Sequence, residues 1–134
     1  MSDRAAIENL LNRYSLAYDL PDLDMMESVF TKDAVFTLVI AGGDPVTFEG
    51  RDAIMKLMRD SLAQQTDQRR HNNSNLIIDD SDPDVIRTTH YLTLLATENG
   101  EISLLSAGVY RNEIVEEEGQ LKIRKLHLEL DKSY

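Results

Sequence analysis

The chain has 134 residues and carries 24 Asp and Glu against 14 Lys and Arg, which gives a formal net charge of −10. This length fits one domain, expected over residues 1–134, with a core large enough to enclose a small-molecule pocket. The acidic surface repels phosphate backbones and anionic membranes, so neither nucleic acid nor a membrane is expected as a partner. The chain has no cysteine, which excludes disulfides, thiolate metal sites and a cysteine nucleophile.

No targeting or spanning segment is visible in the sequence. The start MSDRAAIENLL is polar and charged, and it lacks the apolar run of a signal peptide. No other run approaches the roughly 20 apolar residues of a membrane span. A cytoplasmic location is therefore the expectation.

The first half of the chain predicts three helices and a hairpin. Apolar residues recur at helical spacing over 2–18, with Ser2 or Asp3 as the N-cap. Pro21 cannot continue that helix, and Asp22 can cap a second one over 22–30. TKD at 31–33 indicates a turn, and strands are expected at 34–40 and 46–50 around the turn AGGDP. Residues 51–65 predict the third helix.

The second half predicts four long strands. They are expected at 69–79, 84–97, 101–116 and 120–130, separated by the turn signals DDSDPD, TENGE and EEEGQ. This spacing is typical of an antiparallel meander. The fold class is therefore α+β, a cone in which three N-terminal helices pack on one face of a strongly curved antiparallel sheet.

Strand alternation indicates which residues line the inside of the cone. The more apolar face of 85–96 carries Ile86, Thr88, His90, Leu92, Leu94 and Ala96. The same alternation groups His71 with Asn73, Asn75 and Ile77, and it groups Ile102, Leu104, Ser106, Gly108 and Tyr110. A few polar groups among apolar ones on a concave wall is the composition of a ligand pocket, so a hydrophobic small-molecule ligand is expected. Phe36 and Tyr110 are expected wall residues suited to a ring-shaped ligand, and His90 is expected to line the pocket. The opposite face carries Val, Leu and Tyr residues, which favours a homo-oligomer, a dimer or trimer.

Three side chains could carry chemistry. Tyr14 and Asp19 lie near the end of the first helix, and His71 opens the first long strand. If the helix end closes over the sheet, Asp19 can reach His71, and a carboxylate on one imidazole nitrogen fixes the tautomer and raises the basicity of the other. His71 would then be a general acid or base, and Tyr14 would donate a hydrogen bond to a substrate oxygen. Such a set needs neither metal nor cofactor, and it suits proton abstraction beside a carbonyl followed by elimination or isomerisation.

Each of these residues also has a purely structural interpretation. His71 could be a partly exposed strand-end residue, Asp19 could cap the second helix, and Tyr14 could pack in the core with its hydroxyl bonded. Arg69 and Arg70 are expected to be solvated or paired with acidic neighbours. The three histidines share no obvious ligand spacing, so no metal site is expected.

A resemblance to a known family extends over nearly the whole chain. It rests on AIENLLNRYSLAYDLPDLDMMESVFTKDAVF, FEGRDAI, RRHNNSNLII and SAGVYRNEIVEEEGQLKIRKLHLELD. These stretches resemble the SnoaL-like branch of the NTF2-like (cystatin-like cone) superfamily, which implies the NTF2-like α+β cone. The superfamily includes dehydratases, dehydrochlorinases, isomerases, polyketide cyclases and non-catalytic subunits, so it does not by itself imply one function.

Within that superfamily, scytalone dehydratase and bile-acid 7α-dehydratase are similar in placing an Asp near the first helix end and a His at the opening of the first long strand. Asp19 and His71 match those two positions. Tyr14 matches a tyrosine of the bile-acid enzyme, and Tyr18 matches one of scytalone dehydratase. The resemblance therefore implies catalytic roles for Asp19, His71 and Tyr14, and a substrate contact for Tyr18.

Other positions depart from the pattern. His90 matches a histidine of scytalone dehydratase that is not its second catalytic one, and the position of that second histidine falls at Ala96. Ser106 matches a polar pocket residue, which implies a substrate contact, while Gly108 replaces an asparagine. The substrate therefore does not follow from the resemblance.

These observations predict a cofactor-free, dehydratase-like lyase or isomerase acting on a hydrophobic cyclic small molecule, such as a polyketide-like, steroid-like or aromatic compound. One alternative comes from GVYRNEIVEEEGQLKIRKLHLELD, which looks like the β subunit of aromatic-ring-hydroxylating dioxygenases and implies a non-catalytic binding or assembly subunit. Further alternatives are a polyketide cyclase and an epoxide hydrolase. Epoxide hydrolysis would need several carboxylates and an arginine around a water molecule. The residues expected to line the pocket include only one well-placed carboxylate.

Overall fold

The computed structural model describes residues 3–134. The elements in chain order are α1 (Arg4–Asp19), α2 (Leu23–Ser28), β1 (Phe30–Ile40), β2 (Val46–Glu49), α3 (Arg51–Gln64), β3 (Gln68–Asp79), β4 (Ile86–Glu98), β5 (Glu101–Glu117) and β6 (Gln120–Leu130). All three expected helices are present, and the four expected long strands are present to within two residues at either end.

The caps of the first two helices follow from short polar side chains. The carboxylate of Asp3 accepts hydrogen bonds from the amides of Ala5 and Ala6 and so begins α1. Asp22 does the same for α2 by accepting from the amide of Met25 at 3.0 Å. The alternative cap of α1, Ser2, lies outside the described residues.

The sheet has six strands in the order β2-β1-β6-β5-β4-β3. The meander expected for β3 to β6 is confirmed, because each of these strands pairs antiparallel with the next. One pair differs from the expectation of a wholly antiparallel sheet, since β1 lies parallel to β6. Parallel neighbours need a long crossover, and here the whole chain between β1 and β6 supplies it.

The predicted turn at residues 31–33 is wrong, because these residues belong to β1. Phe30 pairs with Ile123 and Val35 pairs with Lys125, so the register shifts between them and the segment TKD is taken up as an irregularity of the strand. Tertiary pairing with β6 therefore overrides the local turn signal of a polar tripeptide.

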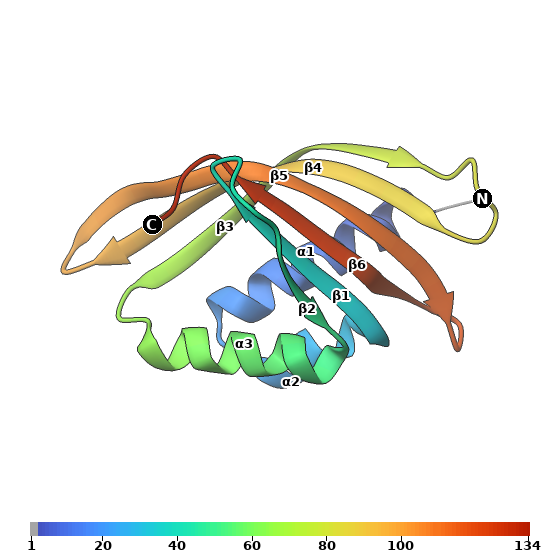
Figure 1. Cartoon of the computed structure of the whole chain (residues 1–134), viewed down its shortest axis with the longest axis horizontal. Coiled ribbons are helices and arrows are strands. Elements are labelled where there is room, and N and C mark those ends of the chain that lie inside the picture. Colours follow the sequence, from blue (N-terminus) through green and yellow to red (C-terminus); the bar gives the residue numbers. More distant parts are fainter. Residues whose placement is uncertain (1–2) are drawn as a thin grey trace.

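The sheet arches over the helices (Figure 1). All three helices lie on its concave side, with α1 under β3 to β6 and α3 at the open edge below β2, so the expected α+β cone is confirmed. The core fills the space between the helices and the sheet; its largest fully buried side chains include Tyr110, Phe30, Ile7, Met26, Ile54 and Leu92.

Two bulges change which residues face the core. The β4 face that begins at Thr88 is buried as expected, but β3 has a register break between Ser74 and Ile77, where Asn75 has a φ of 59°. Ile77 is consequently 71% exposed, so its expected place beside His71 is wrong. A one-residue slip moves every later side chain to the other face.

The second bulge lies in β5. Ser106 pairs with Leu94 but Leu104 pairs with Leu95, which leaves Leu105 as the extra residue. Ile102 and Leu104 are therefore 72% and 63% exposed, and their expected position inside the cone is wrong. Ser106, Gly108 and Tyr110 do face inward, as expected.

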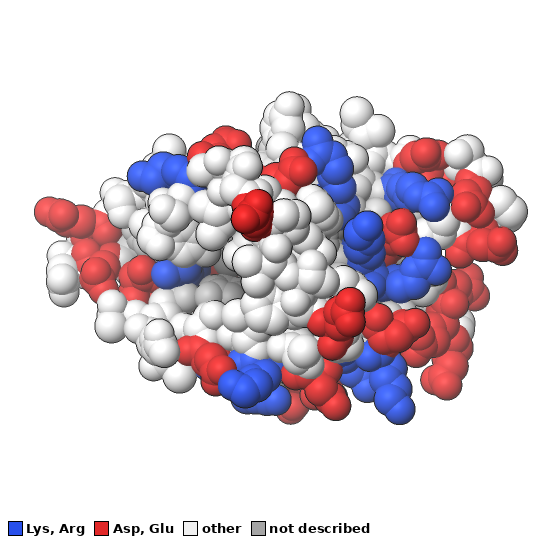
Figure 2. Space-filling model, in the orientation of Figure 1, with Lys and Arg blue, Asp and Glu red and all other residues white. Residues whose placement is uncertain are grey.

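The outer face of β4 and β5 carries an uncharged strip. Tyr91 stands opposite Val109, Thr93 opposite Ala107 and Leu95 opposite Leu104, and none of these residues is acidic despite the charge of the chain. Figure 2 shows charged side chains crowded at the right-hand end of the view, where the β3–β4 and β5–β6 turns lie. No helix among residues 3–134 is long and apolar enough to cross a membrane.

Candidate active site

The end of α1 meets the start of β3 at a carboxylate–imidazole pair. The Oδ1 atom of Asp19 lies 2.6 Å from Nδ1 of His71. The second carboxylate oxygen of Asp19, Oδ2, accepts a hydrogen bond of 2.8 Å from the backbone amide of His71. The contact that the sequence predicted between these two residues is therefore present, while their catalytic roles remain predictions.

Local structure positions both partners. Asp19 is the last residue of α1, and its backbone oxygen accepts a hydrogen bond of 2.7 Å from the side chain of Gln68, which opens β3. Farther along β3, the side-chain amide of Asn73 donates a hydrogen bond of 2.9 Å to the hydroxyl oxygen of Ser15 in α1. Since these bonds join α1 to β3 beside the pair, the carboxylate and the imidazole are held by two regular elements rather than by a flexible loop.

The hydrogen-bonding pattern sets the tautomer of His71. An ionised carboxylate only accepts hydrogen bonds. The Nδ1 atom of His71 must therefore carry a hydrogen and donate it in the hydrogen bond to Oδ1 of Asp19. In the neutral imidazole this leaves the lone pair on Nε2, the nitrogen that could take a proton from a substrate. The side chains of His71 and Asp19 are 8% and 7% exposed, so the pair is largely withdrawn from bulk water.

Tyr18 lies edge-on to the imidazole. Its ring centroid is 5.1 Å from that of His71, and its hydroxyl donates to Oε1 of Gln65 at 3.0 Å. Burial raises the pKa of Tyr18 to about 12, while the nearby Arg69 acts in the opposite direction. Tyr18 therefore stays a neutral phenol at ordinary pH and lies against His71, while its expected substrate contact remains a prediction.

Tyr14 is buried in the core, where its ring contacts those of Phe30 and Tyr110 at centroid distances of 5.7 and 6.4 Å. Burial is the main cause that raises the pKa of Tyr14 and of Tyr110. A hydrogen bond with Tyr110 adds to the raised pKa of Tyr14. Tyr14 therefore packs in the core against Tyr110, and its expected catalytic role remains a prediction.

His90 faces the inside of the cone, as expected. It stacks on Tyr110 at 4.9 Å, and the side-chain amide nitrogen of Asn112 lies 3.5 Å from its Nδ1. Burial lowers the pKa of His90 to about 4, so this imidazole is neutral at pH 7. With Asn12, Asn73 and other residues it lines a cavity of about 250 Å³ along the first half of α1.

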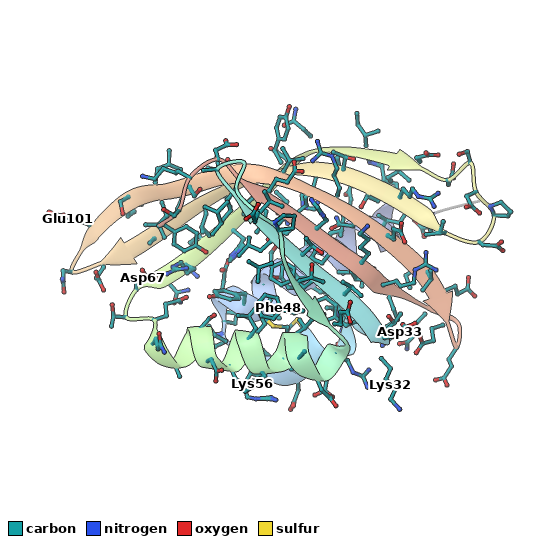
Figure 3. All side chains as sticks on the ribbon, viewed as in Figure 1. Lys32, Asp33, Phe48, Lys56, Asp67 and Glu101 are labelled. Carbon is teal, nitrogen blue, oxygen red and sulfur yellow. The ribbon has the colours of Figure 1, made fainter. Side chains whose placement is uncertain are left out.

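The remaining two predicted residues do not contact the pair directly. Phe36 is buried on β1 and stacks on Phe48 of β2 at 6.1 Å (Figure 3 labels Phe48, between β2 and α3). Ser106 is buried on β5, and its hydroxyl donates to the backbone oxygen of Lys132 at 2.8 Å. The expected substrate contacts of Phe36 and Ser106 therefore remain predictions.

Sequence reasoning missed several polar residues around the pair. Gln68 and Gln65 gave no signal, because their roles depend on where the α3–β3 connection meets α1 and Tyr18. Asn73 was expected on the face of His71, but its bond to Ser15 of α1 was not. Arg69 pairs with Asp67 at 2.6 Å, which confirms its expected pairing with an acidic neighbour. Within residues 3–134, no three His, Asp or Glu side chains are grouped so as to hold a metal ion.

The arrangement can accept and return a proton. It has one imidazole with a free Nε2, a carboxylate that can stabilise the imidazolium, and buried phenols that remain protonated. These groups are suited to general acid–base chemistry.

Solved structures with similar folds come from several bacteria. A Catenulispora acidiphila protein in complex with S-DNPA has a TM-score of 0.82 at 25% identity, with 95% of this chain and 92% of that chain covered. A Novosphingobium aromaticivorans protein assigned as the beta subunit of an aromatic-ring-hydroxylating dioxygenase has a TM-score of 0.83 at 17% identity, with 98% and 90% covered. A protein from the same organism assigned as a scytalone dehydratase has a TM-score of 0.76 at 23% identity, with 94% and 82% covered.

No curated protein matches the chain significantly. The last two structures are below 25% identity and therefore show a shared fold alone. The SnoaL-like domain family matches residues 1–127, nearly the whole chain. The chain belongs to the SnoaL-like domain family.

Proposed function

We propose that this protein is a cofactor-free lyase or isomerase acting on a hydrophobic cyclic small molecule. His71 is the general acid and base, and Asp19 is the carboxylate that orients it. The observation that supports this most is the use of both carboxylate oxygens of Asp19 on His71, one on Nδ1 at 2.6 Å and one on the backbone amide at 2.8 Å. A carboxylate that only capped a helix would not need this double contact.

The proposed step begins at Nε2 of His71. This nitrogen takes a proton from a carbon beside a carbonyl, and the electrons of the broken C–H bond form an enolate. The enolate then re-forms the carbonyl while a β-hydroxyl leaves, and the imidazolium gives its proton to that oxygen, so the products are an enone and water. In a substrate without a leaving group, the proton returns to a different carbon and the result is isomerisation.

Two phenols support the developing negative charge. Tyr14 and Tyr110 share a hydrogen bond and both stay protonated, so one of the two hydroxyls can donate to a substrate oxygen. The other phenol then strengthens that donor through the bond between them. Hydrogen-bond donors fixed before the reaction are worth more in a buried site than in water.

The test is turnover of ring-containing model compounds. The purified protein is incubated with cyclic β-hydroxy ketones and β,γ-unsaturated ketones, and formation of the conjugated enone is followed by absorbance. His71→Gln should lower the rate by about 10²- to 10⁴-fold, the usual contribution of acid–base catalysis. His127→Gln, on the outer face of β6, is the matched control and should keep full activity. Equal rates for His71→Gln and the wild type, with both variants folded by circular dichroism, would contradict the proposal.

A second candidate function is a non-catalytic binding or assembly subunit. It is favoured by the similarity to a protein assigned as a dioxygenase beta subunit, together with the uncharged outer strip on β4 and β5. In the proposal preferred here, that strip is covered by a second copy of this chain. A large partner protein that co-purifies stoichiometrically from the native host would favour the assembly subunit instead.

Self-association is measured by light scattering after size exclusion. Tyr91→Asp and Leu104→Asp place charges on the outer strip and should convert the oligomer to a monomer. Lys56→Asp on the exposed side of α3 is the matched control and should leave the mass unchanged. A monomeric wild type at 100 µM, a concentration at which a dimer of about micromolar Kd would form, would rule out this interface.

A further inference from the structure

The residues after β6 are bonded to β5. The backbone amide of Asp131 donates to the oxygen of Ala107 at 2.8 Å, and the hydroxyl of Ser106 donates to the oxygen of Lys132 at 2.8 Å. Ser106 is a buried residue of the inner face of β5. An inward-facing hydroxyl of the cone therefore holds residues 131–134, here called the strap, against the sheet.

The strap ends on an arginine beside the site. The guanidinium carbon of Arg69 lies 4.9 Å from the ring centroid of Tyr134, which is a cation–π contact. Arg69 is fixed in place by Asp67 at 2.6 Å, and Asp67 in turn accepts a hydrogen bond through its backbone oxygen from Gln65 at 3.2 Å. In Figure 3, Asp67 lies where β3 begins, at the same end of the molecule as Glu101 in the β4–β5 turn.

The same contacts lead inward to the catalytic pair. Gln65 accepts the hydroxyl hydrogen bond of Tyr18, whose ring lies against His71. Tyr18, Gln65, Arg69, Leu105 and Tyr134 line one cavity of about 420 Å³.

We infer that Tyr134 is a gate over the entrance to His71, held closed by Arg69. The imidazole is only 8% exposed, so a substrate reaches it only after some covering side chain moves. Tyr134 is 59% exposed and contacts Arg69 through its ring, so its side chain can move away more readily than a buried one. The effect of this gate on turnover depends on the proposed function. Its effect on the access of a reagent to His71 does not.

The gate is tested by chemical access to His71, without any substrate. Diethyl pyrocarbonate acylates neutral imidazole nitrogen, and in His71 only Nε2 is available because Nδ1 is bound to Asp19. The rate of modification at each histidine is followed by peptide mass spectrometry. His127, on the outer face, is the internal reference. His90, buried in the core, reports any general loosening of the fold.

Tyr134→Ala should raise the rate at His71, relative to His127, by roughly three- to six-fold, because an exposed cation–π contact favours the closed form by a factor of about two to five. Arg69→Gln should have a similar effect. Tyr134→Phe keeps the ring and should keep the wild-type rate, and Lys56→Ala, on the exposed side of α3, is the control. An unchanged rate at His71 in Tyr134→Ala, or an equal rise at His90, would overturn the gate.

Discussion

The contact between Asp19 and His71 can be isolated by a double-mutant cycle. His71→Ala removes the imidazole but keeps the backbone amide, so the hydrogen bond from that amide to Oδ2 of Asp19 survives. The coupling energy between Asp19→Ala and His71→Ala therefore reports the contact between Oδ1 and Nδ1 alone. This separation is possible because each carboxylate oxygen has its own partner.

The burial of the pair sets the expected size of the coupling. Exposed ion pairs are typically worth about 0.2–1 kcal/mol. Hydrogen bonds to charged groups contribute about 1.5–3 kcal/mol. With side chains 8% and 7% exposed and 2.6 Å between the atoms, this contact belongs to the second class. We therefore expect a coupling of about 2 kcal/mol.

The assay is urea unfolding of the wild type, the two single variants and the double variant at pH 7.5, followed by far-UV circular dichroism. Equal m-values in all four proteins are required, because only then do the midpoints report stability alone. A coupling below about 0.5 kcal/mol, the value of a surface pair, would refute the reasoning that this contact is buried and charge-assisted.

Three further predictions concern the interior of the cone. Burial lowers the pKa of His90 from its usual 6.5 to about 4, so between these pH values the unfolded chain binds more protons than the folded one. Stability therefore falls as the pH is lowered through this window, by about 3 kcal/mol in all. His90→Phe should reduce the fall in urea midpoint between pH 7.5 and pH 5, and an unchanged fall would contradict the burial of a neutral imidazole. Gly108→Ala should cost about 2 kcal/mol or more, or prevent folding, because the added Cβ overlaps the backbone oxygen of Glu129 on the neighbouring strand; wild-type stability in thermal unfolding would show that the strands are not this close. Tyr14→Phe should cost about 1 kcal/mol by removing the hydroxyl that bonds to Tyr110, and no change in urea midpoint would show that this bond does not form.

Regular patterns made much of the fold predictable from the sequence. Short polar side chains at Asp3 and Asp22 mark helix starts, and the alternation through His90 on β4 identifies its buried face. The pairing of Asp19 with His71 was predictable because a helix end and a strand start were expected to meet. All these features depend on local periodicity or on a helix boundary, which a sequence displays directly.

The features that were not predictable depend on contacts between distant segments. The bulges at Asn75 and Leu105 insert one residue each and invert the faces beyond them, and neither position has a residue type that demands a bulge. The parallel pairing of β1 with β6 and the position of Tyr134 over Arg69 arise only when the C-terminal segment meets residues much earlier in the chain. Likewise, the bond from Tyr14 to Tyr110 joins residues that are far apart in sequence.

The central claim is that Asp19 holds His71 with its proton on Nδ1 and its lone pair on Nε2. The most direct measurement is long-range ¹H–¹⁵N NMR of the imidazole in its neutral form, in which the two nitrogens have distinct shifts. We predict the Nδ1–H tautomer in the wild type. In Asp19→Asn the amide oxygen must serve the backbone amide of His71, which leaves the amide NH₂ facing Nδ1, so the proton should move to Nε2. An Nε2–H tautomer in the wild type, or no change in Asp19→Asn, would contradict the account.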